Sequence, residues 1–514
     1  MLTIGEDKLT LEDFSGILLQ NTEITISPDA LQRVEKSFNF LKEYSKDKII
    51  YGINTGLGPM AQYQVSDEDQ VRLQYNAIRS HSSGMGERIP DICVKTAMVC
   101  SLNAYLKGNS ALHPEVVILL KEMINRSIIP VVPEHGGVGA SGDLVQLAHV
   151  ALVLIGEGDV SYKGEIRPVA EVFEENGLKP AKVHLREGLG LINGTYVMTG
   201  TGIVNLINAV NLLNWSLAAS SMINEIVGSF NDYFSKELNS IKMHPGQQTI
   251  AAGIRSFLEG SQMIRRREDH FFNGKHSHEE YMQDKVQEYY SVRCVPQVLG
   301  PVYETIENAV RVLLNEANSS SDNPVIDMEA GDVFHGGNFH GDYVSTEMDK
   351  LKISVTKLSM LAERQLNFLV NSKLNGKLPP FINLGKLGVN FGMQGAQFTA
   401  TSTVAENQTL SFPMSLHSIS CNNDNQDIVS MGTNAALITR KVIENAYQVL
   451  SIEMMAIAQA FDYLDINGKS SPISQKIIEN IRKVTPTFRE DTVRYKEIEE
   501  LKQFMMTHPV EILK

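Results

Sequence analysis

Apolar residues recur at helical spacing over several long stretches of the chain. The spacing i, i+3, i+4, i+7 is clearest at Thr305–Ala317, Met348–Ser372 and Asn434–Leu464. The last two stretches exceed the three or four turns of an average helix. Because a long helix with one apolar stripe needs other helices to cover that stripe, the pattern predicts a bundle of long helices.

Strand-like alternation of apolar and polar residues is scarce. Its best example is 159–173, which we expect to form a short hairpin. The chain is therefore predicted to be mainly α. Polar, glycine-rich loops separate the predicted helices, and such loops are where a rigid scaffold usually carries its functional side chains. These loops lie at 51–58, 135–142, 188–194, 319–324, 335–341 and 422–427.

Charge and composition exclude several classes of partner. The 514 residues are 43% hydrophobic and 21% charged, as in an ordinary globular protein, and their formal net charge is −14 with no basic block. We therefore expect neither nucleic acid nor an anionic membrane as a partner. The length exceeds what one compact core usually supports, so two or three regions are expected.

Targeting signals and paired cysteines are not evident in the sequence. The first residues lack the basic and then apolar pattern of a signal peptide. The apolar stretch 195–220 is interrupted by Asn, Thr and Ser, so it predicts a buried helix and no membrane span. The four cysteines lie far apart without a C-x-x-C pair, which favours reduced thiols and a cytoplasmic location.

The stretch 135–142, HGGVGASG, surrounds Ser141 with glycine just before an apolar helical pattern. For a phosphate cradle, GINTGLG (52–58) and GLGLING (188–194) resemble dinucleotide fingerprints only loosely, since neither has the G-x-G-x-x-G spacing or clearly follows a strand, and G-x-x-x-x-G-K-[ST] occurs nowhere in the chain. A serine nucleophile would need G-x-S-x-G at a turn from strand to helix, and GASGD does not have that spacing. Both interpretations fail.

Two loops offer metal ligands in an unusual spacing. HGGNFHGD contains His335, His340 and Asp342, and NNDNQD at 422–427 offers oxygen ligands. Neither matches H-E-x-x-H or a calcium-binding loop. Supporting or structural roles are favoured for these residues, and no metal is expected.

A covalent rearrangement of the backbone is the remaining interpretation. The unhindered amide nitrogen of Gly142 is able to attack the carbonyl carbon of Ala140 if the loop is kinked. Loss of two waters then closes a five-membered ring and turns Ser141 into a dehydroalanine-like alkene. That product is an electrophile, which no ordinary side chain supplies.

The stretch ASGDLVQLAH resembles the A-S-G-D-L-x-P-L-A-H signature of the aromatic amino acid ammonia-lyases, which act on histidine, phenylalanine or tyrosine. One departure is Gln146, where the family usually has proline, but this position lies outside the ring-forming triad. Six further motifs resemble the family in family order, and together they cover most of the chain from about 45 to 465. They are YGINTGLG (51–58), LINGT (191–195), QEYYSVRCVPQVLG (287–300), SDNP (321–324), GNFHGD (337–342) and NQDIVSMG (425–432).

The resemblance implies a fold, a cofactor and an assembly. Ala140, Ser141 and Gly142 would form a methylidene-imidazolone (MIO) group without any metal, nucleotide or pyridoxal phosphate. An N-terminal domain at 1–200 would hold an inner lid loop and the MIO loop, and a helical bundle domain would follow at 201–514. The family forms homotetramers whose sites draw on three subunits. The chain resembles the short bacterial form without a shielding domain, and it lacks the G-S-S-x-M-P loop of the related fumarases and aspartases.

The resemblance also assigns roles to single residues. Ser141, within the MIO, would take up the substrate amine, and Tyr51 would remove the β-proton. Arg293 would hold the substrate carboxylate, for which a planar guanidinium is well suited, and Tyr290 would assist the amine or the MIO. Four more residues match polar or aromatic positions around these groups, with a structural role as the alternative: Asn193, Gln287, Asn323 and Phe339.

Substrate choice rests on two short stretches. The selectivity pair falls at Ser80 and His81, which resembles histidine lyases, whereas Asn425 and Gln426 match tyrosine and phenylalanine lyases. Histidine lyases carry a glutamate in place of Gln426, and a neutral amide supplies neither the charge nor the base. The wider context most closely resembles the tyrosine ammonia-lyases of pigment-forming bacteria. We expect tyrosine deamination to trans-4-coumarate, with a histidine lyase or an MIO-dependent aminomutase as alternatives.

Overall fold

The computed structural model describes residues 1–272, 280–282 and 284–513, and the chain divides into two compact units. The first unit contains Met1–Ile207, Ala309–Asp349 and Pro413–Arg440. The second unit contains Asn208–Asn308, Lys350–Phe412 and Lys441–Lys514. The expected domain boundary at 200 falls inside a helix, Tyr196–Val227, and it stays a prediction.

Short helices and small sheets build most of the first unit. Its helices are α1 (Leu11–Leu19), α2 (Pro28–Tyr44), α3 (Asp67–His81), α4 (Asp91–Tyr105), α5 (Pro114–Asn125), α6 (Leu144–Leu154), α7 (Val169–Asn176) and α8 (Glu187–Ile192), with 3-10 turns η1 (Gly58–Met60) and η4 (Met414–Leu416). Its strands are β1 (Leu2–Ile4), β2 (Ile24–Ile26), β3 (Met85–Arg88), β4 (Ile129–Pro130), β5 (Pro133–His135), β6 (Asp159–Tyr162), β7 (Glu165–Pro168), β8 (Val325–Asp327) and β9 (Asp332–Phe334).

The predicted hairpin is present but shorter than expected. Strands β6 and β7 pair antiparallel with Asp159 opposite Pro168, and β4 adds a third strand on the other side of β6. The second strand ends at Pro168 because α7 begins at the next residue. Val172 and Phe173 of α7 are buried, so their apolar spacing belongs to a helix and not to the strand.

Three helices of the first unit pack against one another and bring loop ends together. Helices α3, α6 and α8 are in mutual contact. Helix α3 ends at His81, α6 begins directly after the glycine-rich loop, and α8 leads into Asn193. Helix α4 lies almost wholly in the core, with every residue from Thr96 to Tyr105 buried. This packing sets the positions of the three segments from which a site is built.

The long helices that the apolar pattern predicts are all present. They are α9 (Tyr196–Val227), α14 (Val295–Ala317), α15 (Asp342–Val370) and α18 (Gly432–Leu464). Helix α14 starts ten residues before the predicted stretch, because Pro301 lies within it without ending it. Of the described helices, only α9 is long and apolar enough to cross a membrane, and 78% of its apolar window is buried. That burial agrees with the expected core helix.

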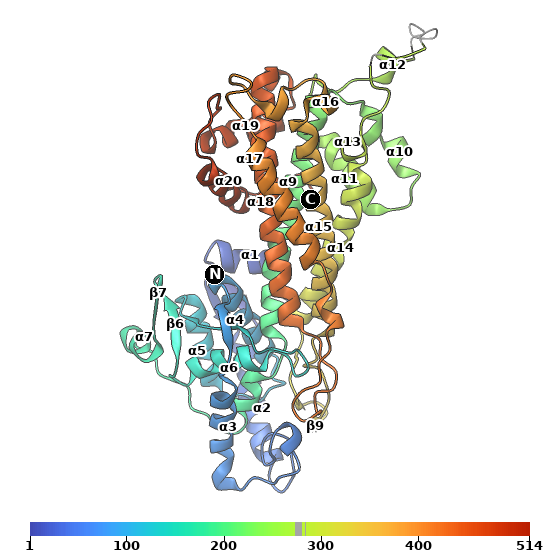
Figure 1. Ribbon diagram of the computed structural model, residues 1–514. Coiled ribbons are helices and arrows are strands. Elements are labelled where there is room, and N and C mark those ends of the chain that lie inside the picture. The colour runs from blue at the N-terminus through green and yellow to red at the C-terminus, as the bar shows by residue number, and fades with distance from the viewer. Residues whose placement is uncertain (273–279, 283, 514) are drawn as a thin grey trace. The chain divides into compact units, whose positions relative to one another are not determined.

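The second unit is a bundle of long helices that lie side by side (Figure 1). Polar side chains join them, since Ser220 Oγ of α9 lies 3.2 Å from Gln365 Oε1 of α15, and Asn407 Nδ2 donates to the Val442 carbonyl of α18 at 3.2 Å. The expected bundle is therefore confirmed. Its other elements are η2 (Asn231–Phe234), α10 (Lys236–Ser240), α11 (Pro245–Phe257), α12 (Arg267–His270), α13 (Tyr290–Arg293), α16 (Ser372–Asn375), η3 (Pro380–Ile382), α17 (Gln394–Leu410), η5 (Asn467–Lys469), α19 (Pro472–Val484) and α20 (Tyr495–Thr507).

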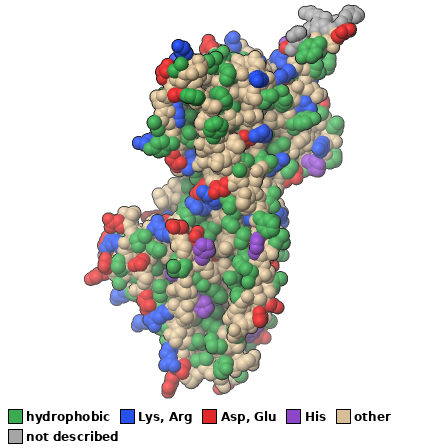
Figure 2. All heavy atoms as spheres, in the orientation of Figure 1, with side chains coloured by type: hydrophobic (Ala, Val, Ile, Leu, Met, Phe, Trp, Pro, Cys, Tyr) green, Lys and Arg blue, Asp and Glu red, His purple; other side chains and the backbone are tan. Residues whose placement is uncertain are grey.

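The surface mixes charges of both signs. Lys and Arg side chains are interspersed with Asp and Glu side chains over the face shown in Figure 2. The four cysteines form no disulfide, and Cys93 and Cys100 are buried. Burial raises the pKa of the Cys100 thiol, which keeps it protonated.

Candidate active site

The loop around Ser141 is held in a conformation that requires glycine. Gly142 has a φ of +69°, in the left-handed region that favours glycine. A Cβ at position 142 would overlap the carbonyl oxygen of Gly194. The same carbonyl accepts a hydrogen bond from the backbone N–H of Asp143 at 2.8 Å. The loop therefore lies directly against the Asn193–Gly194 turn, with no room for a side chain.

Asp143 anchors the end of the loop from inside the protein. Its carboxylate is fully buried and accepts hydrogen bonds from the backbone N–H groups of Val197 and Met198, at 2.8 and 2.9 Å, in the first turn of α9. The hydroxyl of Thr433, in the first turn of α18, donates to the other oxygen. A negative charge is favoured at helix N-termini. Burial nevertheless dominates and raises the pKa of Asp143 to about 6, while these donors lower it.

Backbone and side-chain groups hold the other end of the loop. The Gly139 carbonyl accepts from the backbone N–H of Gly341 at 3.0 Å and from Ser430 Oγ at 3.1 Å. His340 Nδ1 lies 3.2 Å from the Ala140 carbonyl oxygen. These contacts come from the two motifs GNFHGD and NQDIVSMG, so motifs far apart in sequence meet at this loop.

Gln146 stands where the family usually has proline, and the structure accommodates it. Its side chain is buried, and its Nε2 donates to the Glu134 carbonyl at 3.1 Å. This contact joins the start of α6 to β5, at the beginning of the glycine-rich loop. The departure from the signature therefore adds a tie to the loop and leaves the triad 140–142 untouched.

Ser141 lies at the wall of a cavity of about 560 Å³. Its Oγ accepts a hydrogen bond from Gln426 Nε2 at 3.1 Å, and both side chains are half-buried. The sequence-predicted residues that line this cavity are Tyr51, Ser80, His81, Ser141, Asn193, Asn425 and Gln426. The structure thus brings together seven residues from five separate segments of the first unit.

Tyr51 faces this cavity from the first glycine-rich loop. Its hydroxyl oxygen accepts a hydrogen bond from the backbone N–H of Gly58 at 2.9 Å. The loop closes on itself between these two residues, and η1 continues the wall through Pro59 and Met60. The contact fixes where the phenol oxygen lies.

His81 ends α3 with one ring nitrogen committed to the backbone. Its Nδ1 lies 2.8 Å from the Ala77 carbonyl oxygen and 3.2 Å from Ser80 Oγ. A carbonyl only accepts, so Nδ1 carries the proton in this contact and Nε2 of the neutral ring is left as an acceptor. An acceptor at this place suits a donor such as a phenol hydroxyl.

Asn193 contributes a buried acceptor that the described part of the chain leaves unpaired. It is 3% exposed, and its Oδ1 has no hydrogen-bond partner there. A buried amide oxygen without a partner costs free energy, and because Asn193 also lines the cavity, its oxygen is available to a donor bound there. Its backbone N–H is used, since it donates to the Leu189 carbonyl at 3.0 Å at the end of α8.

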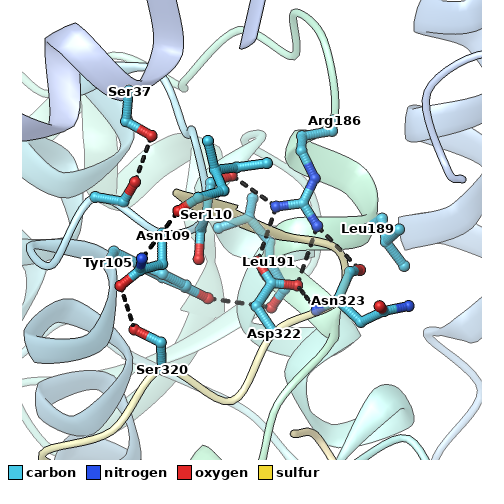
Figure 3. A network of polar contacts seen from close by, with 12 residues as sticks. Ser37, Tyr105, Asn109, Ser110, Arg186, Leu189, Leu191, Ser320, Asp322 and Asn323 are labelled. Atoms are coloured by element: carbon cyan, nitrogen blue, oxygen red, sulfur yellow. Dashed lines mark hydrogen bonds and ion pairs between the residues drawn. The ribbon is translucent and has the colours of Figure 1, made fainter. Parts of the chain in front are cut away.

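Asn323 and Phe339 do not line this cavity. Asn323 supports the loops instead, because its Oδ1 accepts from the Gly336 N–H at 2.8 Å. The neighbouring Asp322 forms a fully buried ion pair with Arg186 at 2.8 Å, and Arg186 also donates to the carbonyls of Ser110 and Asn323 (Figure 3). This pair fixes the SDNP loop to the residue that precedes α8, which no motif had indicated.

Gln287, Tyr290 and Arg293 belong to the second unit and line a separate hollow of about 480 Å³. The Arg293 guanidinium lies 4.5 Å from the centre of the Tyr290 ring and donates to the Glu288 carbonyl at 2.6 Å. The Tyr290 side chain is 72% exposed. The roles of these three residues stay predictions.

The candidate metal loops hold no cluster of three ligands in the part of the chain that the structure describes. His340 Nε2 lies 2.9 Å from Asp342 Oδ2, while His335 is exposed. Among those residues, only His113, Glu115 and His184 have ligand atoms mutually close enough to hold a metal ion. His340 supports the Ser141 loop, in agreement with the supporting role expected from sequence.

The residues at Ser141 fit a methylidene-imidazolone. The left-handed Gly142 and its contact with Gly194 kink the loop, as ring closure between 140 and 142 requires. The unpaired Oδ1 of Asn193 and the amide of Gln426 lie at the same cavity wall and would hold the group and its substrate.

Known proteins resemble the whole chain. Residues 9–483 match the family described as aromatic amino acid lyase. A tyrosine 2,3-aminomutase from Myxococcus sp. (strain Mx-B0) is 40% identical over 485 residues, which cover 93% of this chain and 92% of the relative. A histidine ammonia-lyase from Caldanaerobacter subterraneus subsp. tengcongensis is 38% identical over 463 residues, 90% of this chain and 88% of the relative.

A solved structure has nearly the same fold as this chain. The tyrosine aminomutase from Streptomyces globisporus has a TM-score of 0.94 and 34% identity, with 98% of this chain and 96% of that chain covered. The mainly α fold is therefore confirmed. The motifs and the comparisons agree, and the chain belongs to the MIO-dependent aromatic amino acid lyase family.

Proposed function

We propose that the protein is a tyrosine ammonia-lyase that converts L-tyrosine to trans-4-coumarate and ammonia. The observation that supports this best is the composition of one cavity wall. Ser141 and Tyr51, the residues proposed for the chemistry, share that cavity with His81, whose Nε2 is left to accept a hydrogen bond. A phenol hydroxyl is the matching donor on tyrosine, and phenylalanine has none.

Ala140, Ser141 and Gly142 form the methylidene-imidazolone in this proposal. The chemistry that this group supplies is an electrophile for the substrate amine, so neither a metal nor pyridoxal phosphate is needed. The Ser141 hydroxyl leaves as water when the group forms, so Gln426 Nε2, which donates to it in this structure, and Asn193 Oδ1 would then be available to hold the group or its substrate by hydrogen bonds. The Asp143 carboxylate, buried behind the loop, positions the triad through its contacts with α9 and α18.

Tyr51 acts as the base that removes the β-proton, and the Gly58 N–H keeps its oxygen in place. Arg293 holds the substrate carboxylate with its planar guanidinium. Tyr290 assists the amine, Gln287 and Asn425 contact the substrate, and Asn323 supports the surrounding loops through its bond to Gly336. Phe339 is proposed to lie next to the methylidene-imidazolone, as the family resemblance implies. Following the family resemblance, we propose a homotetramer in which several subunits contribute residues to each site. We also propose a cytoplasmic location, as the unpaired cysteines favour.

Histidine is disfavoured as the substrate by Gln426. Its neutral amide donates to Ser141 Oγ, and it offers no carboxylate to pair with or deprotonate an imidazole. An aminomutase is the second candidate, because relatives at about 40% identity are tyrosine 2,3-aminomutases. Such an enzyme uses the same substrate but returns the ammonia to the β-carbon, so the two candidates differ in product alone.

The test compares initial rates on tyrosine, phenylalanine and histidine and identifies the products by chiral chromatography. We expect 4-coumarate from tyrosine and a much lower rate on phenylalanine. A site built to pair a hydroxyl rejects the analogue without it by up to about 10⁴–10⁵-fold. The variant His81→Phe should narrow that gap. Urocanate as the main product would overturn the substrate, and β-tyrosine as the main product would replace the lyase with an aminomutase.

A further inference from the structure

Two histidines and a glutamate meet in the first unit, and none of them lines the cavity of Ser141. His113 is the N-cap of α5, Glu115 lies in its first turn, and His184 precedes α8 by three residues. One ligand atom from each side chain lies within 4.8 Å of the other two. The side chains are about one third exposed, at 32%, 38% and 35%, so ions in solution reach them.

The separations between the ligand atoms are close to those of a metal site. His184 Nε2 lies 3.3 Å from Glu115 Oε1, and His113 Nδ1 lies 3.8 Å from the other carboxylate oxygen, Glu115 Oε2. His113 Nδ1 also accepts the Glu115 backbone N–H at 3.4 Å, a helix-cap contact that an ion at this nitrogen would replace. Bonds of about 2.0–2.2 Å in a tetrahedron place ligand atoms roughly 3.3–3.6 Å apart. The two imidazole rings have centroids 4.4 Å apart. Shifts of the ligand atoms by about 1 Å, through side-chain rotation, are therefore enough to surround one ion.

A buried carboxylate fixes the backbone beneath this cluster. Glu187 is fully buried, and one of its oxygens accepts from the backbone N–H of His113 at 3.1 Å. Its other oxygen accepts from the backbone N–H of His184 at 2.9 Å and of Leu185 at 2.8 Å. One side chain thus ties together two histidines that are far apart in the sequence.

The side chains of the cluster are oriented as well. The backbone N–H of Lys182 donates to Glu115 Oε1 at 2.7 Å, and the same oxygen lies 3.3 Å from His184 Nε2. The ring of Phe38 meets both imidazole rings edge to face, with centroids 5.0 Å from His113 and 5.8 Å from His184. Ligands that are positioned beforehand lose less conformational freedom when an ion binds.

We propose that His113, Glu115 and His184 bind a Zn²⁺ ion. Two imidazole nitrogens and one carboxylate oxygen are a ligand set that zinc accepts, and a water molecule completes the tetrahedron. The ion would join the start of α5 to the segment that leads into α8. Its role is therefore structural, and it is independent of the proposed reaction.

The experiment measures Zn²⁺ binding to the full-length chain without a histidine tag. The protein is treated with chelator, desalted and mixed with ZnCl₂, and the retained zinc is counted after gel filtration. We expect one Zn²⁺ per chain and a rise in Tm of roughly 3–6 °C at a zinc concentration near 100 times Kd. Binding of Co²⁺ in place of Zn²⁺ should give the visible absorption of a tetrahedral complex.

Three variants locate the site. His113→Gln, His184→Gln and Glu115→Gln should each weaken zinc binding at least about 10-fold and lose the rise in Tm. In chelator, His184→Gln and Glu115→Gln should melt close to the wild type, whereas His113→Gln also loses the helix cap that His113 Nδ1 forms with the Glu115 backbone N–H. The amide oxygen in the Glu115→Gln variant is still able to accept from the Lys182 N–H, so this variant is the one most certain to fold. The control His244→Gln, at an exposed position in the second unit, should bind zinc as the wild type does.

The outcomes are decisive in both directions. Loss of the bound zinc in these three variants, with retention in His244→Gln, supports the site. Absence of retained zinc in the wild type would overturn the proposal and leave a hydrogen-bonded contact between His184 and Glu115. Equal binding by the wild type and all three variants would place the ion elsewhere and overturn the proposal as well. Neither result depends on whether tyrosine is the substrate.

Discussion

The loop around Ser141 and the segment Tyr290–Arg293 differ in how completely the chain holds them. Gly139, Ala140 and Asp143 all have hydrogen-bond partners in the first unit, and much of the loop is buried. Tyr290 is 72% exposed, and Arg293 pairs with a backbone carbonyl and a neighbouring ring.

The difference separates two kinds of functional residue. A ring closure between backbone atoms needs a loop that is held in one conformation before the reaction, and buried contacts provide this. A group that binds a substrate carboxylate needs a charge that the substrate is able to reach, and Arg293 is only half-buried, beside the exposed ring of Tyr290. Changes at the first region should therefore remove the electrophile or the fold around it, while changes at the second should weaken binding alone.

The largest effect is expected from Ser141→Ala. Without the serine hydroxyl no alkene forms. The near-ultraviolet absorbance expected of the methylidene-imidazolone and the turnover should therefore both vanish. Stability should change little, because position 141 is half-buried and the loop is held mainly by contacts of Gly139, Ala140 and Asp143. The measurements are an absorbance spectrum and a thermal melt, with Ser83→Ala as the control. Persistence of the absorbance in Ser141→Ala would show that the absorbing group is not formed from residues 140–142.

Tyr51→Phe should give the next largest effect. Removing a general base typically costs 10²–10⁴-fold in rate, and we expect kcat to fall by about that factor. The near-ultraviolet absorbance should remain, since Tyr51 has no hydrogen bond to the triad 140–142. Measuring both quantities on one preparation separates lost chemistry from a lost electrophile. A rate near that of the wild type would move the role of base to another residue, and Tyr290→Phe would then be the next variant to measure.

Arg293→Lys should weaken binding without affecting the first region. Hydrogen bonds to charged groups are worth about 1.5–3 kcal/mol, so loss of one of the two parallel bonds should lower kcat/KM by roughly 10–100-fold, mostly through KM. Absorbance and Tm should match the wild type. Arg266→Lys, an exposed pair partner of Glu268, is the matched control. A drop in absorbance in Arg293→Lys would contradict the separation of the two regions.

The sequence was informative about these regions to different degrees. Apolar spacing alone was enough to predict α14, α15 and α18, because a 3.6-residue period reports directly which face is buried. The need for glycine at 142 was also visible in the motif, and the contact with Gly194 gives its physical cause.

The partners of the loop were not visible in the same way. Asp143 sits inside the signature, but its role depends on the first turns of α9 and α18, which lie 54 and 290 positions away. The Arg186–Asp322 pair and the cluster of His113 and His184 likewise join segments that only folding brings together. The spacing of apolar residues reveals local periodicity, whereas contacts between distant segments produce no repeating pattern in the sequence.

Asp143 offers a smaller effect that is specific to the buried region. Its pKa is about 6 in the folded protein against 3.8 as the ordinary value. Below about pH 4 the group is protonated in both states, and between about pH 4 and 6 only the unfolded chain ionises. Stability should therefore fall as the pH rises through this window, by about 3 kcal/mol, and level off above pH 6.

Denaturant unfolding at a series of pH values measures this slope. Asp143→Asn removes the titration and should flatten the slope between pH 4 and 6, because an amide is neutral throughout this range. Asp7→Asn, at an exposed position, should keep the slope of the wild type. An unchanged slope in Asp143→Asn would assign the titration to another buried acid.

The smallest expected effect is that of chelation on turnover. The electrophile is built from the chain's own backbone, so exhaustive dialysis against chelator should leave kcat and KM as they were. The proposed zinc ligands lie outside the cavity lining, and removal of zinc should lower Tm without changing the near-ultraviolet absorbance. Measured together, these quantities distinguish a metal that stabilises the fold from one that reacts. Loss of turnover on chelation, restored by Zn²⁺, with Tm and absorbance unchanged, would contradict the independence of the metal from the reaction.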